Sequence, residues 1–212
     1  FGEPPKKKVL FPPHPAIKEA AHSIGLDMSK QSLGLFKISA DTIYYPVFDL
    51  VYAAQTIKIG SESLKASLKR VVAGLKVVLK DKDDTVLSSS IDSVAVRITN
   101  IYSELNYYTG EPQGIPRTIA FPLARSIDGT QMSNSTVMLF PSAGKSEFQL
   151  TITLKNGNVK SFKQTLSSPL NANTKLTLTL SLGNIFSEES SGDFTVDNWN
   201  EKNENIDVPI IE

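Results

Sequence analysis

The sequence of 212 residues predicts an all-β protein, and three observations lead to this prediction. Apolar residues recur at every second position in several segments, as they do in strands that bury one face. These segments are short, and they are separated by turn-forming glycine, proline and asparagine residues. No long segment is clearly helical, and one stretch, 64–79, fits either a helix or a strand. A rhythm of short strands and turns is typical of a β-sandwich or a barrel.

The ambiguous stretch overlaps 67–80, the densest apolar part of the chain, and it has two alternative interpretations. At helical spacing, its leucines and valines form one amphipathic stripe. At a period of two, every second residue from Val71 to Leu79 points to the same side. The valine content, a glycine in mid-segment and the alternation of 94–98 favour a strand. We therefore predict a buried strand, joined through the acidic turn 81–84 to the strand at 94–98 as an antiparallel hairpin.

The other strands are predicted from the same alternation. Before the central hairpin they lie at 33–38, 43–48 and 50–59, after a proline-rich extended tether at 1–15 and a helical turn at 15–23. After the hairpin they lie at 119–123, 148–154, 159–166 and 176–182. Asn156-Gly157 predicts a tight hairpin between the second and third of these later strands. Residues 106–116 contain two glycines and two prolines without periodicity, so we place a domain boundary near Gln113.

The composition excludes several classes of protein. Lysine and arginine together number 22, as do aspartate and glutamate, so no net field draws the chain to nucleic acid. The absence of cysteine excludes disulfides, thiolate metal sites and thiol nucleophiles. No apolar run is long enough for a transmembrane helix. Because the sequence begins with Phe1 rather than methionine, we expect a processed chain.

No motif predicts an enzyme, a metal site or a cofactor. Residues 142–146 resemble the end of a phosphate-binding loop, but Leu139 occupies the position that requires glycine, and a strand is expected to follow. His14 and His22 lack the neighbours that build a zinc site or a triad. The acidic groups do not follow the spacing of a calcium loop. The triplet beginning at Asn134 fits an N-glycosylation acceptor, which in a bacterial protein would be an ordinary loop.

The central hairpin resembles that of a known family. Its order of residues is Leu68, Arg70, Val71, Ala73, Leu75 and Val77, followed after a turn by Val94, Val96 and Ile98. The segment 50–59 resembles the family's preceding strand, and 174–182 with Trp199 resembles its closing segment. The pattern is similar to that of Bacteroidetes fimbrillin-type proteins, which are the subunits and anchors of type V pili together with related surface adhesins.

This resemblance implies a fold, a location and a function. The expected fold is two tandem Greek-key β-sandwich domains of the transthyretin-like type, at 1–113 and 114–212. The expected location is the cell surface, with attachment to the outer membrane through a lipid on a cysteine upstream of the printed sequence. The expected function is a structural or adhesive fimbrial (pilus) component or anchor that joins other fimbrial subunits or surface ligands by β-strand complementation.

One departure from the family pattern concerns processing. In polymerising members, cleavage at an arginine removes the first strand and opens a groove for the neighbour's segment. Here the first arginine is Arg70, which we place inside the core strand, so no arginine precedes that strand. This departure favours an anchor, a tip-like or stand-alone adhesin, a chain already cut, or processing at lysine.

Two groups of residues are candidate interaction sites. Residues 207–211 contain a proline and are expected to form an edge strand, in which Val208, Ile210 and Ile211 would pair with another chain. The alternative function is a surface glycan- or protein-binding sandwich module with an aromatic surface. Its candidate residues are Tyr102, Tyr107, Tyr108 and Trp199, although Trp199 fits a core position better.

Overall fold

The computed structural model describes residues 28–38, 42–55, 66–81, 83–182, 193–197 and 201–207, the last two ranges as backbone. One 3-10 turn, η1 (Met28–Lys30), precedes the strands. The strands are β1 (Ser32–Gly34), β2 (Ile43–Tyr44), β3 (Val51–Tyr52), β4 (Lys69–Arg70), β5 (Ala73–Lys80), β6 (Ile91–Ile101), β7 (Glu104–Asn106), β8 (Pro112–Gln113), β9 (Arg117–Arg125), β10 (Gln131–Ser133), β11 (Val137–Leu139), β12 (Glu147–Leu154), β13 (Val159–Thr165), β14 (Lys175–Ser181), β15 (Asp193–Asp197) and β16 (Glu201–Asp207). The all-β prediction is confirmed. No helix among these residues is long and apolar enough to cross a membrane.

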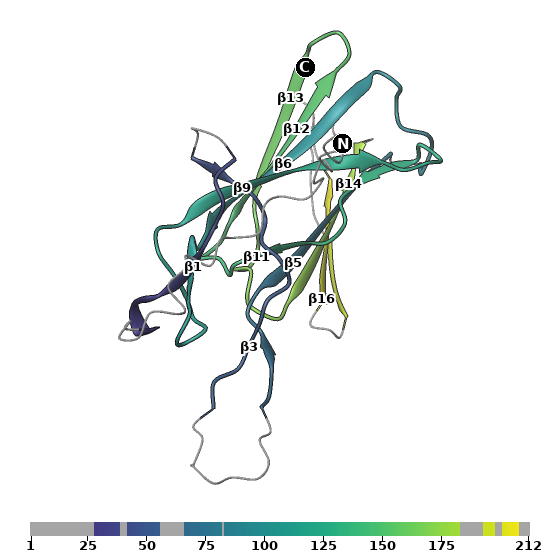
Figure 1. Cartoon of the computed structure of the whole chain (residues 1–212). Coiled ribbons are helices and arrows are strands. Elements are labelled where there is room, and N and C mark those ends of the chain that lie inside the picture. Colours follow the sequence, from purple (N-terminus) through teal and green to yellow (C-terminus); the bar gives the residue numbers. More distant parts are fainter. Residues whose placement is uncertain are drawn as a thin grey trace, which may run out of the picture.

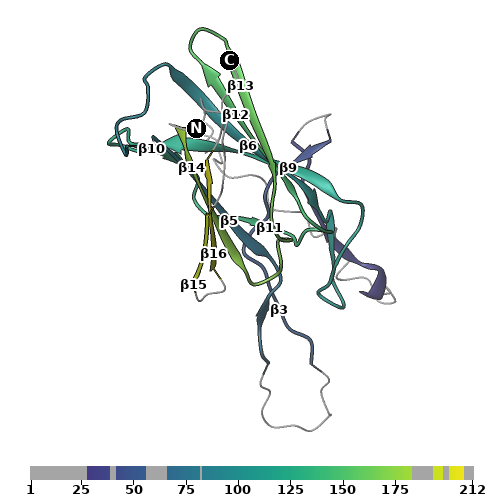
Figure 2. The ribbon, with the colours of Figure 1, turned by 180° about the vertical axis from the view of Figure 1, so that it is seen from behind.

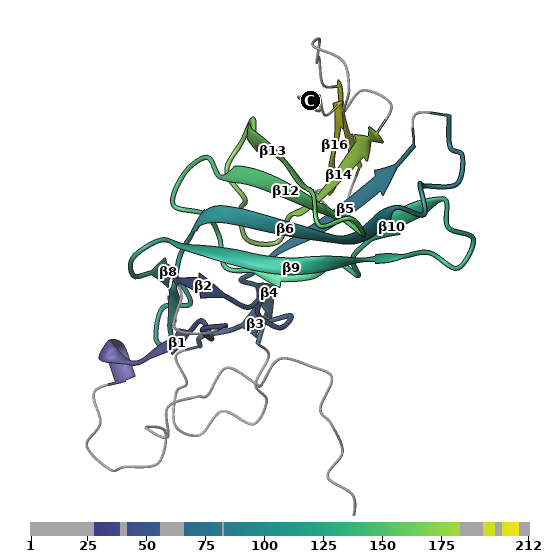
Figure 3. The same cartoon turned by 90° about the horizontal axis from the view of Figure 1, so that it is seen from above.

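The main sheet follows the order β13-β12-β6-β9-β10-β5-β14-β16-β15, with β2 added on β9 and β11 added on β5. Between β9 and β10 the path folds over, so that β13, β12, β6 and β9 form one layer and β5, β14 and β16 form the other (Figure 3). β14 lies between β5 and β16 and is parallel to both. Two smaller sheets, β1-β7-β8 and β3-β4, lie beside these layers and contribute residues to both walls of a groove described below.

β5 is the buried strand that the sequence predicts. Its side chains alternate between the core and a less buried face, and the exposed fraction of Leu75, Val77 and Leu79 is 0 %. The helical alternative is therefore wrong for this segment. Arg70 belongs to β4, which ends before β5 begins, and its side chain is partly exposed. The prediction that Arg70 lies inside the core strand is therefore also wrong.

The predicted hairpin between β5 and β6 does not form. β5 pairs with β10, β11 and β14, whereas β6 pairs with β9 and β12, so the two strands lie in different layers. The connection 81–90 is longer than the few residues that usually close a hairpin, and it crosses from one layer to the other. This crossing lets the apolar faces of both strands meet across the core instead of lying side by side.

Strands from both sides of Gln113 share the same sheet. β6, from the first half, pairs with β9 and β12 from the second, and β5 pairs with β10, β11 and β14. One cluster of buried side chains also includes residues from both halves. Among the described residues, one sheet and one core thus run across Gln113, and the division into two domains stays a prediction.

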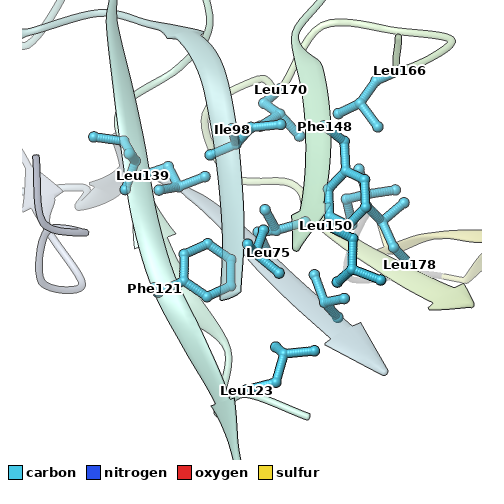
Figure 4. Close-up of a cluster of buried hydrophobic side chains, with 14 of the residues drawn as sticks. Leu75, Ile98, Phe121, Leu123, Leu139, Phe148, Leu150, Leu166, Leu170 and Leu178 are labelled. Atoms are coloured by element: carbon cyan, nitrogen blue, oxygen red, sulfur yellow. The ribbon is translucent and has the colours of Figure 1, made fainter. Parts of the chain in front are cut away.

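The core lies between the two layers (Figure 4). Leu75 of β5 and Leu178 of β14 face Ile98 of β6 and the two phenylalanines Phe121 of β9 and Phe148 of β12. Leu75, Ile98, Phe148 and Leu178 each have an exposed fraction of 0 %. This packing removes apolar surface from water at about 25 cal/mol per Å², and it is the largest favourable contribution to folding.

The later strands agree well with the sequence prediction. β12 and β13 form the expected hairpin, with Gly157 at a φ of +87° in the turn, where a residue without a Cβ is favoured. β14 buries Leu176, Leu178 and Leu180 and leaves its threonines partly exposed, which matches its predicted half-buried character. The predicted tether at 1–15 and helical turn at 15–23 lie outside the described residues.

Asn134 completes the ladder of β5 at a place where backbone pairing fails. β10 and β11 pair with the two ends of β5, and residues 134–136 interrupt them. Asn134 Oδ1 accepts a hydrogen bond from the Val77 N–H at 2.7 Å, and Asn134 Nδ2 donates to the Leu75 carbonyl at 3.0 Å. Residues 134–136 form a loop between β10 and β11, as expected, but the amide of Asn134 is buried and takes the place of a backbone pair on β5.

Candidate functional site

The first candidate site is the outer edge of β13, where the main sheet ends. Among the described strands, β13 pairs only with β12, and no strand closes the gap between β13 and β14. At the two ends of the β12–β13 ladder, the Leu166 N–H donates to the Ser146 carbonyl and the Leu154 N–H donates to the Asn158 carbonyl. The backbone groups of every second residue from 158 to 166 therefore point toward β12. The backbone N–H and C=O groups of Val159, Ser161, Lys163 and Thr165 therefore point away from the sheet.

An apolar slot of about 410 Å³ lies beside this edge, at the seam between the layers. Ile152 and Leu154 of β12, Lys160 of β13 and Leu182 after β14 line it, together with Val86, whose exposed fraction is 66 %. A strand that paired with β13 would lie next to this slot and could place alternate side chains in it. The edge and the slot together have the geometry that strand addition requires.

Two lysines of β13 limit unspecific pairing at this edge. The Lys160 side chain is partly buried, whereas the Lys163 side chain is exposed, with its Nζ 3.4 Å from Glu147 Oε1. Charged side chains on edge strands, above all lysines, are a common protection against edge-to-edge aggregation. A partner at this edge is therefore expected to supply a matching pattern of side chains rather than any extended chain.

The second candidate site is a turn that presents Tyr107 and Tyr108 at the surface. Asn106 holds this turn: its Oδ1 accepts hydrogen bonds from the Tyr108 and Thr109 N–H groups, both at 2.9 Å. Its Nδ2 donates to the Ser29 carbonyl at 3.0 Å, which ties the turn to η1. The exposed fractions of Tyr107 and Tyr108 are 48 % and 64 %. A rigid backbone thus carries two exposed rings.

Tyr52 of β3 joins this turn from the other side. Its hydroxyl donates a hydrogen bond to the Tyr108 carbonyl, and its ring lies against Gly110. Gly110 has a φ of +72°, and a Cβ built there would lie 2.5 Å from the Tyr52 ring. The close approach and the left-handed backbone both require glycine at this position.

The three tyrosines border a groove of about 790 Å³, which we call the tyrosine groove. One wall is the segment from Leu50 to Gln55, and the other is the turn at 105–108. Its lining residues are Leu33, Leu50, Val51, Tyr52, Ala53, Ala54, Gln55, Val71, Leu105, Asn106, Tyr107 and Tyr108. None of these is aspartate, glutamate, lysine or arginine, so the groove favours an uncharged and largely apolar ligand.

An ion pair fastens the β3 wall of the groove to β4. Arg70 Nε lies 2.7 Å from Asp49 Oδ1, and Arg70 Nη2 lies 2.9 Å from Asp49 Oδ2, which is a two-bond pairing of guanidinium and carboxylate. The hydrogen bond from Arg70 lowers the pKa of Asp49 below its ordinary value of 3.8, and the nearby positive charge of Arg70 adds to this effect. The Val71 N–H adds a second connection by donating a hydrogen bond to the Leu50 carbonyl at 3.0 Å.

This ion pair predicts a small, pH-dependent stabilisation. Because the folded pKa of Asp49 is lowered, the contribution is present above the ordinary pKa of 3.8 and is lost as the pH falls through the lower, folded value. The Asp49→Asn variant should be less stable at pH 7 by less than about 1 kcal/mol, since both partners are partly exposed. Urea unfolding at pH 7 and near pH 3 checks this, with the exposed Asp83→Asn as the matched control. An equal deficit at both pH values would contradict it.

Comparison with known protein families gives a match over most of the chain. Residues 14–205 match the family described as fimbrillin-A associated anchor proteins Mfa1 and Mfa2. The chain belongs to this family. The resemblance of the sequence to fimbrillin-type proteins is thereby confirmed. No curated protein matches the chain.

Three solved structures of bacterial proteins are also similar to this member of the anchor family. A candidate adhesin from Bacteroides ovatus has 11 % sequence identity and a TM-score of 0.48, and the match covers 66 % of this chain and 57 % of that protein. A candidate cell adhesion protein from Bacteroides uniformis has 16 % identity and a TM-score of 0.48, with coverage of 87 % and 68 %. A third, from Parabacteroides distasonis, has 11 % identity and a TM-score of 0.34, with coverage of 64 % and 37 %. The chain thus spans little more than half the length of the first of these proteins.

The candidate residues selected from the sequence of this family member lie in different environments in the structure. Tyr107 and Tyr108 are exposed together beside the tyrosine groove, whereas Tyr102 is partly buried and packs against the core. Trp199, Val208, Ile210 and Ile211 lie outside the described residues. Sequence reasoning missed Tyr52 as the opposite wall of the groove and missed the free edge of β13. The lysines of β13 were a usable signal for an edge strand.

Proposed function

We propose that the chain is a structural component of a fimbria at the cell surface and joins a neighbouring subunit by adding that neighbour's extended segment to the edge of β13. Membership of the fimbrillin-A-associated anchor family supports the fimbrial role. The observation that carries the mechanism is the free outer edge of β13 beside an apolar slot. No chemical reaction is needed, because backbone hydrogen bonds and alternate side chains supply the binding.

The location follows from the same family. A fimbrial anchor or subunit acts outside the cell, and we extend the proposal to attachment at the outer membrane through a lipid anchor upstream of the printed residues. The partners in this proposal are other fimbrial subunits. A test of this part is fractionation of the producing bacterium, in which the chain should be found with outer-membrane and sheared fimbrial fractions rather than with the cytoplasm.

The Ser161→Pro variant tests the mechanism. The Ser161 N–H points away from β12, so proline removes an outward donor and places its ring on the free edge without breaking the β12–β13 ladder. We expect about tenfold less of the chain in isolated fimbriae, which is a loss of about 1.4 kcal/mol in joining. The melting temperature of the purified variant should stay within a few degrees of the wild type.

Ser161→Ala is the matched control, because it removes the same side chain and keeps the N–H. This variant should enter fimbriae as the wild type does. Equal incorporation of all three proteins, at equal expression and with unchanged melting temperatures, would exclude β13 as the joining edge.

A further inference from the structure

We propose that the tyrosine groove binds the chain's own proline-rich segment, residues 11–15. This inference is independent of strand addition at β13, because the groove is lined by residues of β1, β3 and β7 and of the segments beside them, and by none of β13. β3 and the start of β13 lie at opposite ends of the molecule in both Figure 1 and Figure 2. The two sites can therefore be tested separately.

The chemistry of the groove selects such a segment. Proline-rich peptides favour the extended polyproline II conformation, and aromatic-lined grooves bind them through ring contacts and hydrogen bonds to their carbonyl groups. The groove supplies exposed rings and hydroxyl donors from Tyr107 and Tyr108, and its lining contains no formal charge. Residues 11–15 read Phe-Pro-Pro-His-Pro, which is apolar apart from one histidine.

A neutral sugar fits the groove less well. Protein sites that bind polar hydroxyl groups need several side-chain acceptors and donors, because buried hydroxyls must be paired. Among the lining residues only Gln55 offers a side-chain amide, since the amide of Asn106 is already bonded to Ser29 and to the backbone of its own turn. Aliphatic side chains make up most of the remaining lining. The lining therefore favours an apolar peptide over a carbohydrate.

The connecting length of chain is sufficient for this segment to reach the groove. The Tyr107 N–H donates to the Gln31 carbonyl at 2.8 Å, and Asn106 Nδ2 donates to the Ser29 carbonyl, so residues 29–31 are held against the turn that carries the tyrosines. The 13 residues from 16 to 28 join this point to Pro15. A chain of that length can span up to about 45 Å. A tether this short gives an effective concentration of the order of millimolar, at which even a weak contact is occupied.

Paired cysteines test the proposal cleanly because the chain has none of its own. We would place one cysteine in the segment, His14→Cys, and one in the groove wall, Gln55→Cys, and follow disulfide formation under mild oxidation by mass and by non-reducing electrophoresis. The matched control pairs His14→Cys with Val159→Cys, an exposed position at the start of β13. A disulfide requires the two Cα atoms to come within about 7 Å.

The expected result is an intramolecular disulfide that forms at least tenfold faster for the 14/55 pair than for the 14/159 pair. Adding Tyr108→Ala, or separately Pro12→Ala with Pro13→Ala, to the 14/55 protein should slow its formation several-fold while the melting temperature stays unchanged. Equal rates for both pairs would overturn the proposal. A disulfide-linked dimer would assign the groove to a second copy. Failure to cross-link, together with Tyr108-dependent binding of a neutral oligosaccharide on a glycan array, would assign it to carbohydrate.

Discussion

The Leu75→Ala variant is expected to lose about 2–5 kcal/mol of the free energy of unfolding. Leu75 is fully buried near the start of β5, where β11 and β14 pair on either side of it and Ile98 and Phe148 face it from the other layer (Figure 4). Such a substitution removes apolar contacts from both layers and leaves a cavity that close-packed neighbours refill only partly. A loss of this size is a large share of the stability of an ordinary domain.

Urea unfolding of the purified protein, followed by circular dichroism, measures this loss. Leu68→Ala is the matched control, because Leu68 is the same residue type just before β4 and its exposed fraction is 66 %. The control variant should stay within about 0.5 kcal/mol of the wild type. If both leucine variants unfolded at the same urea concentration, the placement of β5 between two layers would be incorrect.

The Asn134→Leu variant is expected to cost about 2–4 kcal/mol. The change keeps the size of the side chain but leaves the Val77 N–H and the Leu75 carbonyl without their partners in a buried ladder. Each buried polar group that loses its hydrogen bond costs about 1–3 kcal/mol. In most cores an apolar side chain of equal size would be at least as stable. Here the asparagine is favoured because β10 and β11 leave backbone groups of β5 unpaired beside residues 134–136.

Thermal and urea unfolding of Asn134→Leu and of Asn171→Leu compare a buried with an exposed asparagine, since Asn171 lies on the surface before β14. Only the first should be destabilised. Amide hydrogen exchange adds a local readout, because the Val77 N–H should exchange faster in the Asn134 variant while the amides of β12 keep their relative protection. An Asn134→Leu protein as stable as the wild type would mean that the amide does not replace the missing pairs.

Much of the candidate site could not be predicted from the sequence, although its exposed part could. Tyr107 and Tyr108 were candidates for an aromatic surface, and both are exposed, whereas the lack of periodicity around them was interpreted only as a domain boundary. The opposite wall of the groove depends on Tyr52, which is 56 residues away from Tyr108 and comes from a segment that reads as an ordinary strand. Only the turn held by Asn106 and the glycine at 110 bring the two together.

For β5, β12 and β14, the sequence alone determined that the segment is a strand and which of its faces is buried, because the alternation of apolar and polar residues is a local property that needs no partner to be recognised. The predicted strands at 33–38 and 43–48 are shorter in the structure. Only the tertiary structure decided that β5 and β6 lie in different layers, that Asn134 completes a ladder and that β13 ends the sheet. Strand pairing is made by backbone groups that every residue carries, so its choice depends on how the whole set of apolar faces can be covered at once.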